Sequence, residues 1–315
     1  MRKEKMAKKR MILAMALVFA LAMTAFGNAA AAEYKMGLAV ANLQAEFFNM
    51  IRTSAEARAK ELGIEIVTLD AGGDAETQVN QIKDLITQGV DAIIYIPAGA
   101  SAATVPVNDA KAAGIPVVTV DRNPDGAPGG TFIATNSVDA AKELGEWVVE
   151  QTGGKGKLGI VGGQTGTTPE QDRTKGFSEA LAGSEVEQIW RQDSGGWHQD
   201  EGFAITQDAL QVHPNTTIIF GQADALALGA AQAARTANIS GILIVGFDGD
   251  EAGLRGVANG TIDATMCQQT YLMGALAVDS AIKLINGETL PAEQLLPATL
   301  VTTKEDAEKY LLNHP

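Results

Sequence analysis

Residues 78–96 read QVNQIKDLITQGVDAIIYI and contain, in order, an amphipathic segment, a glycine and a strand-like apolar run. The apolar residues of the first part recur at the spacing of one helix face, at Val79, Ile82 and Ile86. This spacing predicts a helix over residues 78–88 that packs on a sheet, and Gly89 suits the left-handed residue that ends such a helix. Residues 91–96 then match a strand of a parallel sheet that helices cover on both faces.

The same order of helix, glycine and strand recurs along the chain. It appears before this stretch in residues 55–67 and after it in residues 102–120, and it restarts near Asn136. Further strand-like runs lie at residues 36–41, 157–161, 217–220 and 242–245. Such alternation predicts the α/β class, with two Rossmann-like, doubly wound lobes on parallel central sheets.

The N-terminus has the pattern of a secretory signal peptide. Basic residues run through Arg10, an apolar run spans residues 11–26, and Ala29-Ala30-Ala31-Ala32 supplies a small-residue cleavage site. The alternative is a permanent membrane anchor, but the apolar run is shorter than the about 20 residues of a spanning helix. We therefore expect residues 1–32 to be removed on export, with cleavage near Ala32.

Charge and cysteine content exclude several classes of function. The formal net charge is −14, and removing the leader's excess of five positive charges leaves about −19. This acidity argues against nucleic acid, which is bound by clustered Lys and Arg, and against adsorption to an anionic membrane. Cys267 is the only cysteine and follows the strand-like residues 262–266. We expect it to act as a small buried hydrophobe rather than as a catalytic thiol.

Polar and aromatic residues follow the predicted strands or begin the next helix. Ligands of open parallel sheets bind outside the carboxyl ends of the strands, so these positions are candidates for binding. In chain order the candidates are Phe47, Phe48, Asp121, Arg122, Arg173, Asp248 and Gln268. Arg173 belongs to a helix that begins at residues 168–171, TPEQ, which have a capping-box pattern with proline at the first helical position.

Each candidate also has a simpler structural interpretation. Asp248 caps the next helix, Asp121 and Arg122 form an exposed ion pair, Arg173 is solvated, and the phenylalanine pair belongs to the core. In this fold, however, all of them border a single crevice. Together they supply carboxylates that accept from hydroxyls, guanidinium groups that donate, an amide, and aromatic faces that cover C–H surfaces. The inventory predicts a neutral polyol as ligand.

These candidate residues, together with their neighbours in the sequence, indicate a resemblance to a known family. Over essentially all of residues 33–315 the chain resembles periplasmic sugar-binding proteins of the ribose-binding type, the soluble receptors of ABC importers. Five motifs carry the resemblance in the family's order and spacing: Phe47-Phe48, residues 118–122 (VTVDR), residues 166–177 (GTTPEQDRTKGF), residues 220–229 (FGQADALALG) and residues 245–249 (VGFDG).

The resemblance implies the site and the way it works. The family's ligand contacts correspond to Phe47, Phe48, Asp121, Arg122, Arg173, Asp248 and Gln268, with Trp197 as the aromatic that closes over the sugar. Three crossovers near Asn136, Gln268 and Leu296 would join an N-terminal lobe (33–135 with 269–297) to a C-terminal lobe (136–268 with 298–315). The lobes are expected to close on the ligand, and the importer's membrane subunits to recognise the closed form. The resemblance thus implies that the protein is a monomeric periplasmic receptor that has no catalytic activity and no cofactor.

Three alanines depart from the family pattern. Ala41, Ala45 and Ala223 stand where ribose-type members have polar contacts. An unmade hydrogen bond to a buried hydroxyl costs about 1–3 kcal/mol, so we expect ribose not to be the best ligand. Gln44 and Gln222 are weaker candidates for contacts that compensate.

Other functions fit the sequence less well. A sugar-responsive repressor shares this fold but begins with a basic helix-turn-helix. A dinucleotide-dependent enzyme is disfavoured, because the glycines after residues 157–161 do not spell G-x-G-x-x-G. No metal site is expected, because the histidines lack metal-binding spacing: His198, His213 and His314. The alternative that stays open is the ligand, which is a sugar, a polyol, an inositol or a small sugar-like signal also presented to a chemoreceptor.

Overall fold

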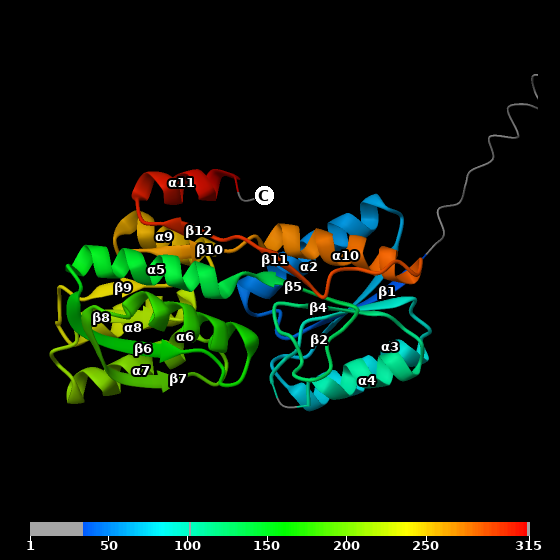
Figure 1. Cartoon of the computed structure of the whole chain (residues 1–315), viewed down its shortest axis with the longest axis horizontal. Helices are drawn as coiled ribbons and strands as arrows, with labels where there is room; N and C mark the ends of the chain where they lie inside the picture. The colour runs from blue at the N-terminus through cyan, green and yellow to red at the C-terminus, as the bar shows by residue number, and fades with distance from the viewer. Residues whose placement is uncertain (1–33, 101, 314–315) are drawn as a thin grey trace, which may run out of the picture.

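The computed structural model describes residues 34–100 and 102–313, which form two α/β lobes side by side (Figure 1). In Figure 1 the lobe that starts the chain, blue to cyan, lies on the right, and the green to yellow lobe lies on the left. The predicted signal peptide, residues 1–32, lies outside the described residues. Within the described ranges, no helix is both long enough and apolar enough to cross a bilayer.

The N-terminal lobe is built on a six-stranded parallel sheet with the strand order β11-β5-β4-β3-β1-β2. Its strands are β1 (Lys35–Val40), β2 (Glu65–Asp70), β3 (Ala92–Tyr95), β4 (Val117–Val120), β5 (Thr131–Thr135) and β11 (Glu293–Leu296). Its helices are α2 (Glu46–Glu61), α3 (Ala75–Thr87), α4 (Thr104–Ala112) and α10 (Thr270–Ile285). Every residue of β3 and β4 is buried, which confirms the predicted strands there.

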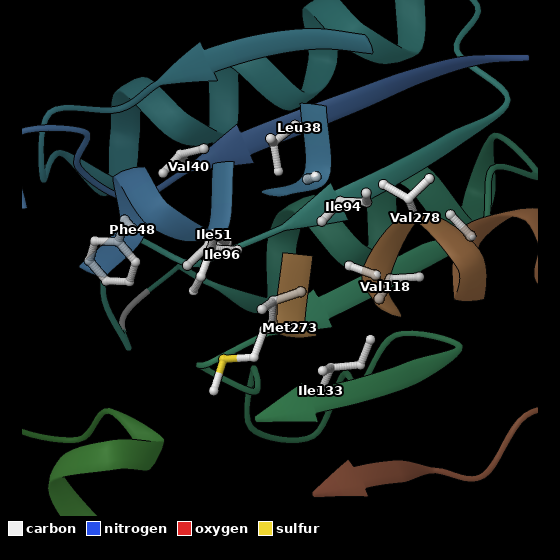
Figure 2. Close-up of a cluster of buried hydrophobic side chains, with 14 of the residues drawn as sticks. Leu38, Val40, Phe48, Ile51, Ile94, Ile96, Val118, Ile133, Met273 and Val278 are labelled. Atoms are coloured by element: carbon white, nitrogen blue, oxygen red, sulfur yellow. The ribbon is translucent and has the colours of Figure 1, made fainter. Parts of the chain in front are cut away.

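Helices cover both faces of this sheet, and side-chain alternation explains the continuous apolar strands. Leu38 and Ile94 belong to the buried cluster that also contains Ile51 of α2 and Met273 of α10 (Figure 2). The neighbouring residue Ala39 points to the opposite face and packs with Leu85 of α3. Successive residues of a strand point to opposite faces, so a sheet covered on both sides needs apolar residues at every position. The buried clusters on the two faces of the sheet thereby hold both helix layers in place next to the strand ends.

The C-terminal lobe repeats this plan around a four-stranded parallel sheet with the order β7-β6-β8-β9. Its strands are β6 (Lys155–Gly162), β7 (Glu185–Asp193), β8 (Ile218–Gly221) and β9 (Leu243–Val245). Its helices are α5 (Ser137–Thr152), α6 (Thr168–Leu181), α7 (Gln199–Val212), α8 (Asp224–Thr236), α9 (Glu251–Asn259) and α11 (Lys304–Asn313). Phe220 packs on the α5–α6 face, and its neighbour Ile219 packs on the α7–α8 face. The expected class, two doubly wound lobes on parallel sheets, is confirmed.

The chain passes between the lobes three times. The first passage follows β5 at Asn136, the second joins β10 (Thr265–Cys267) to α10 through Gln268, and the third joins β11 to β12 (Thr299–Val301). The strands β10 and β12 pair antiparallel, so the second and third passages run side by side. The Asn136 amide donates to the Leu296 carbonyl at 2.8 Å, which ties the first passage to the third. The three passages therefore form one connected strip.

Some local predictions differ from the structure. Helix α2 begins at Glu46, well before the predicted helical start at residue 55, because the two phenylalanines and Ile51 already pack in the core. Strand β7 is not predicted, since most of this edge strand is polar and partly exposed. Cys267 is the last residue of β10 rather than the residue after it. It is buried, and burial raises the pKa of its thiol, as expected for a small hydrophobe.

Candidate ligand-binding site

Strand ends from both sheets meet at one cavity of about 60 Å³ between the lobes. From the N-terminal lobe its lining includes Ala45, Glu46, Phe47, Phe48, Asp121 and Arg122, and from the C-terminal lobe Pro169, Arg173, Trp197, Ala223, Asp248 and Asp250. The lining therefore includes all the primary predicted contacts except Gln268. Parallel strands place their carboxyl ends at the same edge of each sheet, and this brings residues far apart in sequence together.

Asp121 and Arg122 form a buried pair at the end of β4. The Asp121 carboxylate lies 3.6 Å from Arg122 Nε, and Asp121 has a left-handed φ of 62°. The guanidinium donates to the carbonyls of Pro97 and Ala98, both at 3.0 Å, and to Gln164 Oε1 of the other lobe at 3.2 Å. Burial and these three acceptors exclude the exposed ion pair considered from the sequence.

Arg173 and Asp248 form the corresponding pair in the C-terminal lobe. Arg173 NH1 lies 3.3 Å from Asp248 Oδ1 and also donates to the Gln222 carbonyl. The guanidinium carbon stacks 4.0 Å from the centre of the Phe247 ring, a favourable cation–π contact. Arg173 is almost fully buried rather than solvated. Asp248 does not cap α9, since Asp250 holds that position and accepts from the Gly253 amide at 2.6 Å.

Gln268 lies beside the cavity and connects the lobes. Its Nε2 donates to Asp248 Oδ1 at 2.7 Å, and its Oε1 accepts from the Thr135 hydroxyl at 2.6 Å. Thr135 ends β5, so the amide joins a strand end of the N-terminal lobe to a carboxylate of the C-terminal lobe. A movement of Thr135 relative to the C-terminal lobe would therefore change the hydrogen bond that Gln268 makes to Asp248.

Aromatic rings cover two sides of the cavity. Phe47 and Phe48 meet edge to face with centroids 5.2 Å apart, and Arg122 lies 5.1 Å from the Phe48 ring centre. Trp197 lies against Gly163, where an added Cβ would come within 1.8 Å of the indole ring. A side chain at Gly163 would therefore displace Trp197. The rings give the cavity lining an apolar aromatic surface.

The two weaker candidates lie away from the cavity. Gln44 is exposed and is not part of the lining. Gln222 is completely buried, with Oε1 accepting from the Gly163 amide at 2.8 Å and Nε2 donating to Thr174 Oγ1 at 2.8 Å. These partners all belong to the C-terminal lobe. Gln222 therefore supports the loop under Trp197 instead of reaching into the cavity.

Asp224 lies behind the cavity lining and supports the turn that contains Asp248, a role that the sequence analysis did not assign. It is fully buried, and its Oδ2 accepts from the amides of Gly249 at 2.8 Å and Asp250 at 3.2 Å. Its Oδ1 accepts from the Thr265 hydroxyl at 2.6 Å. The turn that it holds contains Asp248 at a φ of 134°, an unusual value for a non-glycine residue. Asp224 thereby holds the Asp248 carboxylate at the cavity.

Glu46 and Asp250 are two further acidic lining residues that the sequence analysis missed. Glu46 starts α2, and its Oε1 accepts from the Glu251 amide of the opposite lobe at 3.1 Å. Asp250 precedes Glu251 directly, and its pKa is raised by burial and also by the Glu46 carboxylate, so the two carboxylates interact across the lobes. The only available signal was their position next to Phe47 and within two residues of Asp248.

Another contact between the lobes replaces the predicted capping box. Helix α6 begins at Thr168 as predicted, but its N-cap is Thr167, whose side chain makes no capping hydrogen bond. The Thr168 hydroxyl accepts from the Asn123 amide of the N-terminal lobe at 2.9 Å. The capping-box prediction is therefore wrong, because this hydroxyl joins the lobes instead of closing its own helix.

Burial perturbs most of the ionisable groups of the cavity. It raises the pKa of Asp248 to about 7, although Arg173 acts in the opposite direction. It raises the pKa of Asp250 to about 6, and it also raises the pKa of Asp121. Burial lowers the pKa of Arg122. Desolvated charges of this kind favour a ligand that supplies hydrogen bonds, and they cluster at functional sites.

Three buried donor atoms of the lining lack a hydrogen-bond partner: Arg122 Nε, Arg173 Nε and Trp197 Nε1. An unpaired buried donor costs about 1–3 kcal/mol, so an acceptor at these atoms would stabilise the closed lobes. Beside them, the carboxylates accept hydroxyl protons. Among the described residues, no group of three or more His, Cys, Asp or Glu side chains is arranged to hold a metal ion. The geometry therefore suits binding of a hydroxylated molecule.

Comparison with known families gives a match over most of the chain. Residues 36–289 match the periplasmic binding protein domain family. The ribose import binding protein of Bacillus subtilis (strain 168) is 30% identical over 272 residues, which cover 86% of this chain and 88% of that protein.

Solved structures show the same architecture. An ABC transporter solute-binding protein from Mycobacterium smegmatis with bound glycerol is 29% identical, with a TM-score of 0.83 over 88% of this chain and 96% of that one. A second, from Bacillus halodurans C-125 with bound myo-inositol, is 25% identical, with a TM-score of 0.83 over 90% of this chain and 99% of that one.

Proposed function

The chain belongs to the periplasmic binding protein family, and we propose that its interlobe cavity captures a monosaccharide or polyol for delivery to an ABC importer. Family members of this type are receptors that bind a solute and release it to membrane subunits, and the chain is accordingly a binding protein rather than an enzyme. Related proteins with bound glycerol and bound myo-inositol support the ligand class.

The observation that carries the proposal is the paired chemistry of the cavity. Each lobe contributes one buried Arg–Asp pair, and the Nε atom of each arginine has no hydrogen-bond partner. In this proposal Asp121 and Asp248 accept from ligand hydroxyls, and Arg122 and Arg173 donate to ligand oxygens. Because the contacts come from both lobes, one ligand stabilises the closed arrangement.

The aromatic residues and Gln268 complete the proposed site. Phe47, Phe48 and Trp197 would cover the apolar faces of the ligand. Gln268 would act at the passage between the lobes, through its hydrogen bonds to Asp248 and to Thr135.

The cavity also bears on ligand choice. Ala45 and Ala223, two of the three alanines that depart from the ribose-type pattern, line it. A volume of about 60 Å³ holds roughly five water-sized spheres, which favours a ligand at the small end of the class. We therefore keep the prediction that ribose is not the best ligand.

The wider assignment follows the family. We propose that the leader through Ala32 directs export to the periplasm and is then removed. We also propose that residues 33–135 with 269–297 and residues 136–268 with 298–315 move as two lobes about the three passages. A single chain supplies both walls of the cavity, which supports a monomer. A chemoreceptor that recognises the closed form is a second proposed partner.

A thermal-shift screen tests the proposed function. Protein from expression of the full chain would be heated with pentoses, hexoses, polyols and inositols at millimolar concentration, and with NAD as a control. A ligand present at about 1,000 times its Kd stabilises by about 4 kcal/mol, a Tm rise of several degrees. We expect such a rise with one group of sugars or polyols. Stabilisation by NAD and by none of these compounds would contradict the proposal.

A further inference from the structure

The cavity carries more negative than positive groups. Four carboxylates line it, and only two guanidinium groups face them. The pairs Asp121–Arg122 and Asp248–Arg173 balance within their own lobes. The remaining carboxylates belong to Glu46 of the N-terminal lobe and Asp250 of the C-terminal lobe, and neither has a basic partner among the described ion pairs.

These two carboxylates interact across the lobes, and each is held by a backbone amide. Glu46 Oε1 accepts from the Glu251 amide, one residue after Asp250, and the Asp250 carboxylate accepts from the Gly253 amide. Glu46 is the first residue of α2, and Asp250 is the N-cap of α9. Glu46 Oε2 has no described hydrogen bond, whereas the Asp250 carboxylate also accepts from the Ala252 amide. Closing the lobes therefore brings two like charges together at the edge of the cavity.

A cation between the two carboxylates would turn this repulsion into attraction between the lobes. A resident metal ion is disfavoured, because the described residues hold no group of three or more suitable ligands. Arg122 and Arg173, whose buried Nε atoms lack a hydrogen-bond partner, line the same cavity and can donate to oxygen acceptors. A ligand that satisfies both features carries hydroxyl or ether oxygens and one positive group. A primary ammonium donates three hydrogen bonds from a compact charge.

We propose, on the basis of the function proposed above, that the preferred ligand is a small amino-polyol or amino sugar whose ammonium group bridges Glu46 and Asp250. The hydroxyl oxygens of the same ligand face the two Arg–Asp pairs. Ligand charge thereby contributes directly to closure, since the ammonium binds one carboxylate from each lobe.

Calorimetric titration with matched pairs of compounds tests this proposal. The pairs are glycerol with 2-amino-1,3-propanediol, glucose with glucosamine, and galactose with galactosamine, at pH 7.5. For at least one pair we expect the amine to bind at least tenfold more tightly than its neutral partner. Glu46→Gln and Asp250→Asn should each reduce that preference several-fold. Both substitutions keep the hydrogen-bond acceptors, and asparagine is a good N-cap, so the fold is preserved.

Glu251→Gln is the matched control. It removes the same charge one residue from Asp250, but the Glu251 side chain is exposed and pairs with Arg255. It should leave the amine preference unchanged. Tight binding of a neutral compound without any gain from its amine would overturn this proposal and leave the proposed function standing. Stabilisation by Ca²⁺ or Na⁺ alone, without amine preference, would also overturn it. A failure of all six compounds and of the wider sugar screen would contradict both proposals.

Discussion

At the scale of single residues, the site depends on two arginines whose environment is set by the fold. Arg173 meets Asp248 at 3.3 Å and stacks on Phe247, while Arg122 is held by carbonyls of its own lobe. Position after a predicted strand, for Arg122, or at the start of a predicted helix, for Arg173, was enough to predict both arginines as candidates. It was not enough to predict that Gln222 turns away from the cavity, because side-chain direction depends on tertiary partners such as Gly163.

Arg173→Ala and Asp248→Ala should each weaken binding of the best ligand by more than tenfold. Each removes a buried charged contact and leaves its partner unpaired, which costs several kcal/mol. Calorimetry gives the Kd, and circular dichroism checks that the fold is intact. Arg235→Ala, on α8 away from the cavity lining, is the control. Near-unchanged Kd values in both variants would mean that the ligand binds elsewhere.

The ligand-free protein should lose stability as pH rises from about 5 to 7.5. Burial raises the pKa of Asp248 to about 7 and that of Asp250 to about 6, against an ordinary 3.8. In that window the folded chain binds protons that the unfolded chain has released, so the free energy of unfolding falls with pH. Arg173 opposes the rise in the pKa of Asp248, whereas Asp250 and Asp121 reinforce it.

Tm measured across this pH range checks the expectation, with Asp248→Asn as the comparison. The variant cannot titrate at this position and should show a flatter profile than the wild type. Equal slopes in the two proteins would show that Asp248 keeps an ordinary pKa.

At the scale of elements, the turn between β9 and α9 is the most constrained part of the site. Asp224 accepts from two amides of the turn and from the Thr265 hydroxyl of β10. Gly253 is required in the same place, because an added Cβ would come within 1.9 Å of the Asp224 carboxylate. The motif in residues 220–229 contributed to the family resemblance, but only the packing of α8 under this turn revealed that Asp224 supports it.

Asp224→Ala should destabilise the protein and weaken binding together. Three donors lose their acceptor, at about 1–3 kcal/mol for each group left unsatisfied. Denaturant unfolding measures the first effect and calorimetry the second. Asp208→Ala, which removes an exposed carboxylate from α7, serves as the control. An unchanged unfolding midpoint and an unchanged Kd would show that the turn keeps its conformation without Asp224.

Helices and strands were predicted correctly where a segment is buried. Prediction failed where contacts with other parts of the molecule determine the local structure. The runs of β3, β4 and β8 are buried on both faces and were recognisable as strands. The start of α6 was predicted correctly, but its capping was not, because the Thr168 hydroxyl bonds the other lobe instead of its own helix. No pattern within residues 168–171 carries that information.

At the scale of the whole molecule, the two lobes are held by a few polar contacts around the cavity. They include Asn123 to Thr168, Arg122 to Gln164, and Glu46 to Glu251. Such contacts are individually worth about 0.5–1.5 kcal/mol, so ligand contacts of similar size are able to shift the equilibrium between open and closed forms. The lobes and their order were predictable from repetition, but these contacts were not, because they join surfaces of separate domains.

Thr168→Val should favour the open form without unfolding either lobe. It removes the acceptor for the Asn123 amide at nearly constant shape, so we expect a Kd two- to tenfold weaker. The radius of gyration without ligand, from small-angle scattering, should increase. Thr236→Val, an exposed change on α8, should alter neither quantity. A smaller radius or a tighter Kd in Thr168→Val would contradict this role.

A crystal structure with the best compound from the sugar and polyol screen tests the central claim most directly. We predict ligand density between the lobes, with ligand oxygens within hydrogen-bond distance of Arg122, Arg173 and Asp248. The N-terminal lobe has a groove of about 690 Å³ lined by Lys111 and Leu284 among others, and none of these three residues lines it. Density in that groove, with the interlobe cavity empty, would contradict the assignment of the site.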